Sequence, residues 1–159
     1  VFIIIIIVFK SIGLPVILVS AIEFAIFINM GIPYYTNTSI PFIASIVIGT
    51  IQLGATVDYA ILMTTRYLKE RNKGADKKTS IRIASETCTK SVIISALSFF
   101  AATFGVGLYS KVDIISSLCS LMARGAIVSM ITVIFILPSL LMVFDKIIVH
   151  TSLGVKADN

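Results

Sequence analysis

The chain has 159 residues, of which 57% are hydrophobic and only 13% are charged, and its formal net charge is +5. An ordinary soluble domain is about 45–50% apolar and about 25% charged. The composition therefore excludes a conventional water-soluble enzyme, a disordered segment and a disulfide scaffold. A mean hydropathy of +1.04 indicates a chain whose solvent is mainly lipid.

Runs of apolar residues divide the chain into five segments. The first, residues 1–9, reaches only about 13 Å as a helix, less than half of a bilayer core, so we expect a chain that begins inside a spanning helix. Four later segments are long enough to cross a membrane, and they cover residues 12–32, 41–65, 92–109 and 126–144. The sequence thus predicts an all-α polytopic membrane protein. Its helix bundle occupies residues 1–146, with four complete transmembrane helices and a partial first one, and residues 147–159 form a tail.

Positive charge is concentrated between the third and fourth predicted spans. Residues 66–90 hold eight of the 13 Lys and Arg residues of the chain. Because cytoplasmic loops carry an excess of basic residues, we predict that this basic loop is cytoplasmic. Alternation of the spans then places the C-terminal tail on the same side. A nucleic-acid site is disfavoured, because Tyr67 is the only aromatic residue among these charges and base stacking needs more.

The local structure of two connecting segments stays open at this point. Residues 66–90 either form a solvated connector or extend the helices. In the second case the third helix continues to Gly74 as its C-cap, and Thr79 or Ser80 caps a short helix that runs into the fourth span. Residues 110–125, predicted to lie on the opposite side, form either an early part of the fifth helix or an interfacial turn.

Two carboxylates, Glu23 and Asp58, fall inside predicted spans. A charged group in a lipid-facing helix costs about 2.5–3.5 kcal/mol or more, so such groups usually face other helices or a water cavity. Thr50 and Gly54 share one helix face with Asp58, and Gly54 allows another helix to approach closely. We therefore expect Asp58 to face a neighbouring helix, either as a proton carrier or as a structural, hydrogen-bonded carboxylate. Tyr59 lies on an adjacent face and can donate a hydrogen bond.

The remaining polar residues within the spans give weaker signals. Glu23 has little polar support nearby, and we consider it either a second protonation site or a locally satisfied carboxylate. Uncharged polar side chains in spans more often hold helices together than take part in a relay. Gln52, Ser95, Ser98 and Thr103 are examples in this chain.

Motifs for several kinds of chemistry are missing from the sequence. It contains no phosphate-binding Walker loop, no Cys/His cluster for a metal and no nucleophile–base pair for hydrolysis. We therefore expect no cofactor and no enzymatic activity. Any energy source has to be an ion gradient or a partner protein.

Five stretches of sequence follow one another at characteristic spacing. They are Gly54-Ala-Thr-Val-Asp58-Tyr59-Ala-Ile61, Thr65-Arg66-Tyr67, Lys73-Gly74-Ala-Asp76, Ser91–Phe104 and Ile136–Leu141. Together they resemble the RND superfamily of proton-driven exporters, most closely its MMPL-type branch in bacterial plasma membranes. The general pattern also occurs in Sec-type protein-translocation motor subunits and in sterol-sensing domains. Tyr59 and the basic loop favour the MMPL-type branch.

The resemblance implies an architecture and a role. Family members contain two pseudo-repeated halves of six spans, each half with a large extracytoplasmic domain, and this chain would be the last five spans of the second half. Asp58 and Tyr59 would match the family's Asp-Tyr proton relay. The expected partners are the N-terminal half, the extracytoplasmic domains, membrane lipids and a lipid or hydrophobic small-molecule substrate. The alternatives are a membrane scaffold or lipid sensor that does not pump, and a Sec-type motor subunit.

Overall fold

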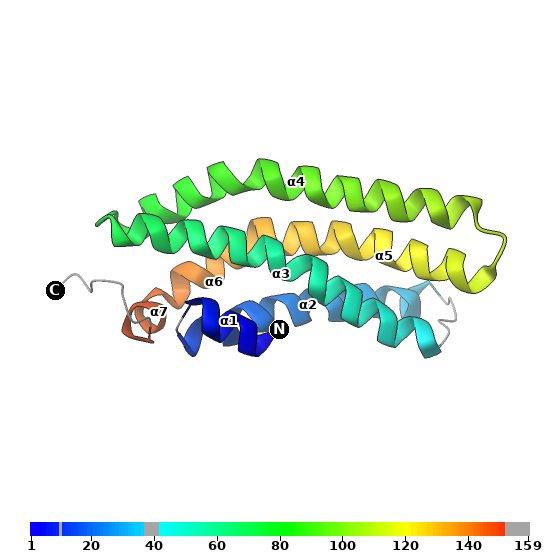
Figure 1. Ribbon diagram of the computed structural model, residues 1–159, viewed down its shortest axis with the longest axis horizontal. Helices are drawn as coiled ribbons and strands as arrows, with labels where there is room; N and C mark the ends of the chain where they lie inside the picture. The colour runs from blue at the N-terminus through cyan, green and yellow to red at the C-terminus, as the bar shows by residue number, and fades with distance from the viewer. Residues whose placement is uncertain (10, 37–41, 152–159) are drawn as a thin grey trace.

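The computed structural model describes residues 1–9, 11–36 and 42–151, apart from the side chains of 149–151, and within these residues every regular element is a helix (Figure 1). The prediction of an all-α polytopic bundle is confirmed. The elements are α1 (Phe2–Phe9), α2 (Gly13–Tyr35), α3 (Phe42–Asn72), α4 (Lys77–Tyr109), α5 (Asp113–Ile131), the π-helical turn η1 (Thr132–Ile136), α6 (Leu137–Val143) and α7 (Asp145–Thr151).

Four helical rods are long and apolar enough to cross a membrane: α2, α3, α4 and the continuous rod from Asp113 to Val143 that combines α5, η1 and α6. The 31 residues of α3 are about 46 Å long, which exceeds the hydrocarbon core of about 30 Å, so part of this helix projects beyond it. The first helix, α1, has eight residues and packs against α2. Four complete helices and one short initial helix match the predicted count.

The predicted loop over residues 66–90 is almost entirely helical. Helix α3 continues to Asn72, and α4 begins at Lys77. Gly74 ends α3 with a φ of +84°, a left-handed conformation that glycine adopts without steric cost. The expectation of helical extensions is therefore correct, and a solvated connector over the whole segment is wrong.

Other predicted boundaries also shift. Asp76, rather than Thr79 or Ser80, precedes α4, because the backbone N–H of Ser80 already closes the first turn on the carbonyl of Asp76 at 2.8 Å. Residues 110–125 are mostly the start of the fifth helix, which begins at Asp113, so the interfacial turn is limited to three residues. The end of α2 passes through Pro33 to Tyr35. The helices are longer than the predicted apolar spans, since a helix continues into polar sequence wherever its backbone hydrogen bonds remain unbroken.

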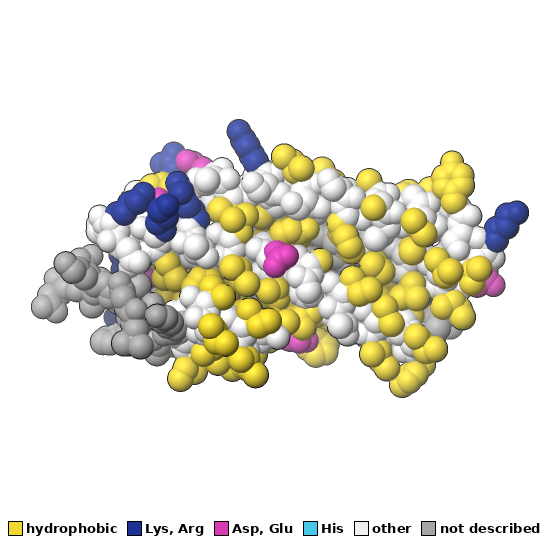
Figure 2. All heavy atoms as spheres, viewed as in Figure 1, with side chains coloured by type: hydrophobic (Ala, Val, Ile, Leu, Met, Phe, Trp, Pro, Cys, Tyr) yellow, Lys and Arg dark blue, Asp and Glu magenta, His cyan; other side chains and the backbone are white. Residues whose placement is uncertain are grey.

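Helix α5 lies at the centre of the bundle, in contact with α2, α3 and α4. The main apolar core joins residues of α2, α3, α4 and α6, and examples that are almost fully buried are Leu18, Ala60, Ala84 and Leu137. Large apolar side chains also cover the outside of the bundle along its length (Figure 2). Phe27 and Phe42, for instance, are 71% and 80% exposed, as suits side chains that face lipid tails.

Lys and Arg side chains gather at the end of the bundle where α3 turns into α4 (Figures 1 and 2). We call this end, which contains residues 66–82, the basic end. Helix α7 is fixed to it through Asp145, whose carboxylate accepts a hydrogen bond from the Tyr67 hydroxyl at 2.5 Å and from the Arg71 guanidinium at 3.2 Å. The start of α7 therefore lies beside the basic turn, as the alternation of spans requires. Residues 152–159 of the predicted tail lie outside the described residues.

Replacing Tyr67 with Phe tests this attachment. The change keeps the fully buried ring and removes a hydrogen bond to a charged acceptor, which is worth about 1.5–3 kcal/mol. We expect Tyr67→Phe to lower the free energy of unfolding, measured in detergent micelles, by about this amount. The matched control is Tyr34→Phe, since Tyr34 is 84% exposed. Equal stability of the two variants would contradict the attachment.

Candidate functional site

Asp58 lies on the surface of this chain, on a narrow strip of α3 that also contains Thr50 and Gly54. We call these three residues the α3 strip. The Thr50 hydroxyl donates to the carbonyl of Ile46 in its own helix at 3.0 Å. A Cβ atom added at Gly54 would meet nothing within 4 Å. The strip is thus small and polar, and it is uncovered by the described part of the chain.

The carboxylate of Asp58 lines a groove of about 510 Å³ between α3 and α4, which we call the α3–α4 groove. Ser91 and Cys88 line it from α4, and the Cys88 thiol lies 3.9 Å from the carbonyl oxygen of Leu62. At its other end the groove reaches Arg66 and Lys69. Asp58 makes no hydrogen bond or ion pair with the described residues.

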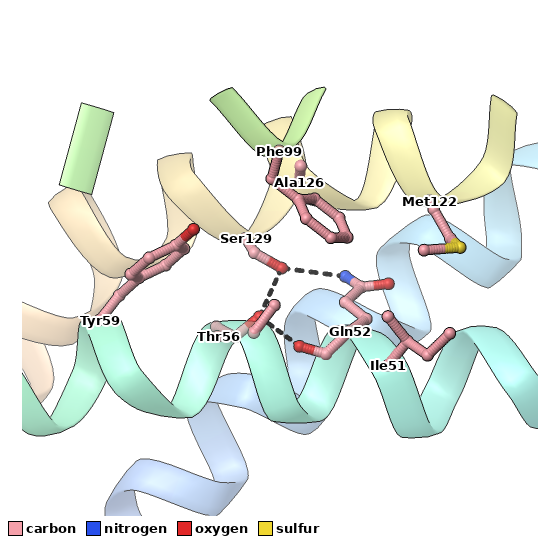
Figure 3. Close-up of a pocket in the computed structure, with 9 residues that line it drawn as sticks. Ile51, Gln52, Thr56, Tyr59, Phe99, Met122, Ala126 and Ser129 are labelled. Atoms are coloured by element: carbon pink, nitrogen blue, oxygen red, sulfur yellow. Dashed lines mark hydrogen bonds between the residues drawn. The ribbon is translucent and has the colours of Figure 1, made fainter. Parts of the chain in front are cut away.

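Tyr59 faces a different cavity from its neighbour in sequence. Its half-buried ring lines a small internal pocket together with Gln52 and Thr56 of α3 and Ser129 of α5 (Figure 3). The pocket holds about 10 Å³, comparable to one water molecule. Asp58 and Tyr59 therefore face two different environments, one at the surface of α3 and one inside the bundle.

Three hydrogen bonds around this pocket tie α2, α3 and α5 together. The side-chain amide of Gln52 donates to the Ser129 hydroxyl at 3.0 Å, and its oxygen accepts a bond from the Asn29 amide at 2.9 Å. The Thr56 hydroxyl lies 2.9 Å from that of Ser129 (Figure 3). All four side chains are buried, so these bonds satisfy polar groups that have no access to water. We call Asn29, Gln52, Thr56 and Ser129 the polar network.

Arg124 extends the polar network within the fifth helix. Its Nε donates to the Asn29 side-chain oxygen at 3.2 Å, while its buried Nη2 has no partner in the described residues. Arg124 belongs to residues 110–125, for which the sequence left an early part of the fifth helix and an interfacial turn open, and the first alternative is correct, because α5 begins eleven residues before Arg124 at Asp113. A cation inside a span-forming helix is expensive and usually faces the bundle interior, as Arg124 does toward Asn29.

The structure separates the other predicted residues from this region. Glu23 is half-buried on α2 and has no hydrogen bond or ion pair among the described residues. Ser95 and Ser98 are exposed on α4, and the Ser98 hydroxyl donates to its own helix at Ile94. Among the uncharged polar residues, Gln52 does hold helices together as expected, whereas Thr103 bonds only to carbonyls of its own helix.

Asn29, Thr56 and Ser129 were missed by sequence reasoning. Each is a polar residue in an apolar stretch, which is the available signal. Their partners lie on other helices, between 23 and 92 residues away in the sequence.

In the part of the chain that the structure describes, no group of three His, Cys, Asp or Glu residues is placed to hold a metal ion.

Comparison with protein families identifies this arrangement of spans. The profile of the MMPL family matches residues 1–151. The chain belongs to the MMPL family. The resemblance found in the Asp58-Tyr59 stretch and its neighbours is thereby confirmed, and the four long apolar helices make the chain a multi-pass membrane protein.

Two curated relatives are similar to most of this chain. "Putative membrane protein ActII-3" of Streptomyces coelicolor is 24% identical over 136 residues, which cover 86% of this chain and 18% of that protein. "Trehalose monomycolate exporter MmpL3" of Mycobacterium tuberculosis is 28% identical over 115 residues, which cover 72% of this chain and 12% of that protein. The chain therefore spans less than a fifth of the length of these relatives. No solved structure matches it.

Gly125 tests whether the polar network holds the bundle together. A Cβ atom at this position would lie 2.7 Å from the Asn29 amide nitrogen and 2.8 Å from the Gln52 side-chain oxygen. Gly125→Ala should force these two side chains apart and lower the free energy of unfolding by about 1–3 kcal/mol. Thermal unfolding in detergent measures the effect.

The matched control for Gly125→Ala is Gly105→Ala on α4, where a Cβ atom would meet nothing within 4 Å. Alanine favours a helix over glycine by up to about 1 kcal/mol, so this control should unfold at the same or a higher temperature. If both variants behave alike, the close contact at Gly125 does not support the bundle.

Proposed function

We propose that this chain is the C-terminal transmembrane part of a proton-motive-force-driven exporter, in which Asp58 takes up and releases the coupling proton. The observation that carries the proposal is the position of Asp58 in an MMPL-family chain. It is an ionisable residue in a span-forming helix, exposed on a strip of small residues and without a partner among the described residues. Left facing lipid, it would cost about 2.5–3.5 kcal/mol or more.

The α3 strip supports a helix from another part of the transporter as the covering partner. Thr50 and Gly54 leave no bulky side chain on this face, and small residues allow two transmembrane helices to pack closely. In our proposal the N-terminal half of the transporter supplies this helix, together with the second half of the relay. Asp58 then lies between the two halves.

Tyr59 links a change at Asp58 to the packing of the other helices. Protonation of Asp58 removes a charge between packed helices and so changes the relative free energy of two bundle arrangements. Tyr59 is adjacent along α3 and lines the pocket beside Thr56 and Ser129. Movement of α3 around Asp58 would thus displace Ser129 of α5. Ser129 lies three residues before the π-helical turn η1, and π-helical turns are often found at functional sites.

The proposed substrate is a lipid, a hydrophobic drug or another amphiphile. The name of the relative MmpL3, a trehalose monomycolate exporter, supports a lipid, although its similarity covers only 12% of that protein. In our proposal the extracytoplasmic domains bind the substrate, and this chain converts the proton gradient into movement. The protein lies in the plasma membrane, with the basic end and the C-terminus in the cytoplasm, as the concentration of Lys and Arg supports.

Asp58→Asn in the complete transporter tests the proton role. The amide keeps the size of the side chain but cannot carry a proton, so we expect export that depends on the proton gradient to be lost while the protein level in the membrane is unchanged. The matched control is Asp113→Asn at the exposed start of α5, which should export normally. Substrate efflux from cells, with and without a proton uncoupler, is the measurement.

Two results would overturn the proposal. Full export by the Asp58→Asn variant would remove Asp58 from the relay. Export by the unmodified protein that is insensitive to the uncoupler would remove the proton gradient as its energy source, and a sensing or assembly phenotype without any export would favour the scaffold that does not pump. Glu23→Gln, measured in parallel, decides between a second protonation site and a locally satisfied carboxylate.

A further inference from the structure

The α3–α4 groove changes character along its length. Near Asp58 its walls are Ile61 and Leu62, and at the basic end they are Arg66 and Lys69. Threonine hydroxyls from both helices, Thr65 and Thr87, lie among the residues that line it. The groove therefore combines a mainly apolar wall with two cations at one end. These features complement an amphiphile that has an anionic head.

Arg66 has hydrogen-bonding capacity left for a ligand. Its Nε is buried, so the donors that can reach a ligand are those of the two Nη groups. Its Nη2 lies 3.6 Å from Glu70, but the same carboxylate oxygen is closer to Lys73, at 2.9 Å. Glu70 is thus shared between two cations. Since a guanidinium has five N–H donors and forms bidentate bonds with phosphate, Arg66 is suited to an anion in the groove.

The groove lies at the depth where lipid headgroups are expected. Residues 41–65 are the apolar part of α3, and Arg66 is the first basic residue after them. Arg66 is eight residues from Asp58, or about 12 Å along the helix axis. A phosphate at Arg66 is therefore well beyond contact distance of the Asp58 carboxylate, with Ile61 and Leu62 between them along the groove.

We propose that the α3–α4 groove binds one anionic phospholipid, with its phosphate at Arg66 and Lys69 and an acyl chain along Ile61 and Leu62. Basic pockets between transmembrane helices are suited to anionic headgroups through charge complementarity. A zwitterionic lipid brings a compensating positive charge and binds more weakly. The site does not depend on proton coupling, and its occupancy is measured without a proton gradient.

Native mass spectrometry of the detergent-purified protein, titrated with phosphatidylglycerol or phosphatidylcholine, counts bound lipids directly. We expect one phosphatidylglycerol to be retained preferentially. The double variant Arg66→Gln/Lys69→Gln should raise the dissociation constant for phosphatidylglycerol roughly thirtyfold, because each basic residue near a headgroup adds to the attraction. The matched control is Lys77→Gln/Lys78→Gln, which removes two exposed charges from the same basic end outside the groove.

A second pair of variants leaves the charge unchanged. Thr87 is exposed, lines the groove and bonds only to the backbone of Ile83, so Thr87→Phe fills the groove without removing a cation or a tertiary contact. We expect this variant to lose the bound phosphatidylglycerol. Thr79→Phe, at an exposed position at the start of α4 outside the groove, should retain it.

Three outcomes would overturn the proposal. If the Lys77/Lys78 control weakens binding as much as the groove variant, the attraction is diffuse. If Thr87→Phe binds phosphatidylglycerol normally, the lipid is held elsewhere. If inorganic phosphate displaces the lipid completely, the apolar wall contributes nothing and the groove binds only a free anion. Loss of lipid binding and loss of proton-dependent export are separate measurements, so either proposal can fail alone.

Discussion

The side-chain amide of Gln52 is the interaction on which the arrangement of this bundle depends. It accepts a bond from Asn29 of α2 and donates one to Ser129 of α5, so a single residue of α3 fixes the positions of two other helices. Apolar packing between helices is weakly directional in lipid, because lipid tails are as apolar as the side chains. Buried hydrogen bonds fix the relative positions of the helices, which apolar packing alone leaves undetermined. Gly125 makes them possible, since any larger residue would occupy the space of both amides.

This arrangement also explains why Asp58 and Tyr59 face different surroundings. The network holds the Gln52–Thr56 face of α3 against α5, and Tyr59 lies on the border of that face. The α3 strip then points away from the helices of this chain. An outward carboxylate is unfavourable in lipid and useful at an interface, so the same polar bonds that stabilise the bundle present the proposed proton carrier to a partner.

The sequence predicts much of the fold and only part of the site. Hydropathy locates the spans because lipid requires apolar length, and Gly74 marks the end of α3 because few other residues adopt a positive φ. Hydropathy does not reveal that residues 66–72 and 77–90 are helical, since helix formation there depends on backbone hydrogen bonds and not on apolarity. The partners of Gln52 are equally hidden. Asn29 and Ser129 are 23 and 77 residues away, and only packing of the helices brings them together.

Charge is distributed along α3 in a way that suits its two proposed roles. The residues from Phe42 to Asp58 carry a single charge, the carboxylate, whereas Arg66, Lys69 and Arg71 follow within a few turns. Basic residues at the end of a long helix hold that end at the headgroups through attraction to anionic lipid. Asp145 adds to this by fixing α7 to Tyr67 and Arg71. The basic end of α3 is then held in place. A change of charge at Asp58 would therefore move the other part of α3, which contains Gln52 and Thr56 and is hydrogen-bonded to α5.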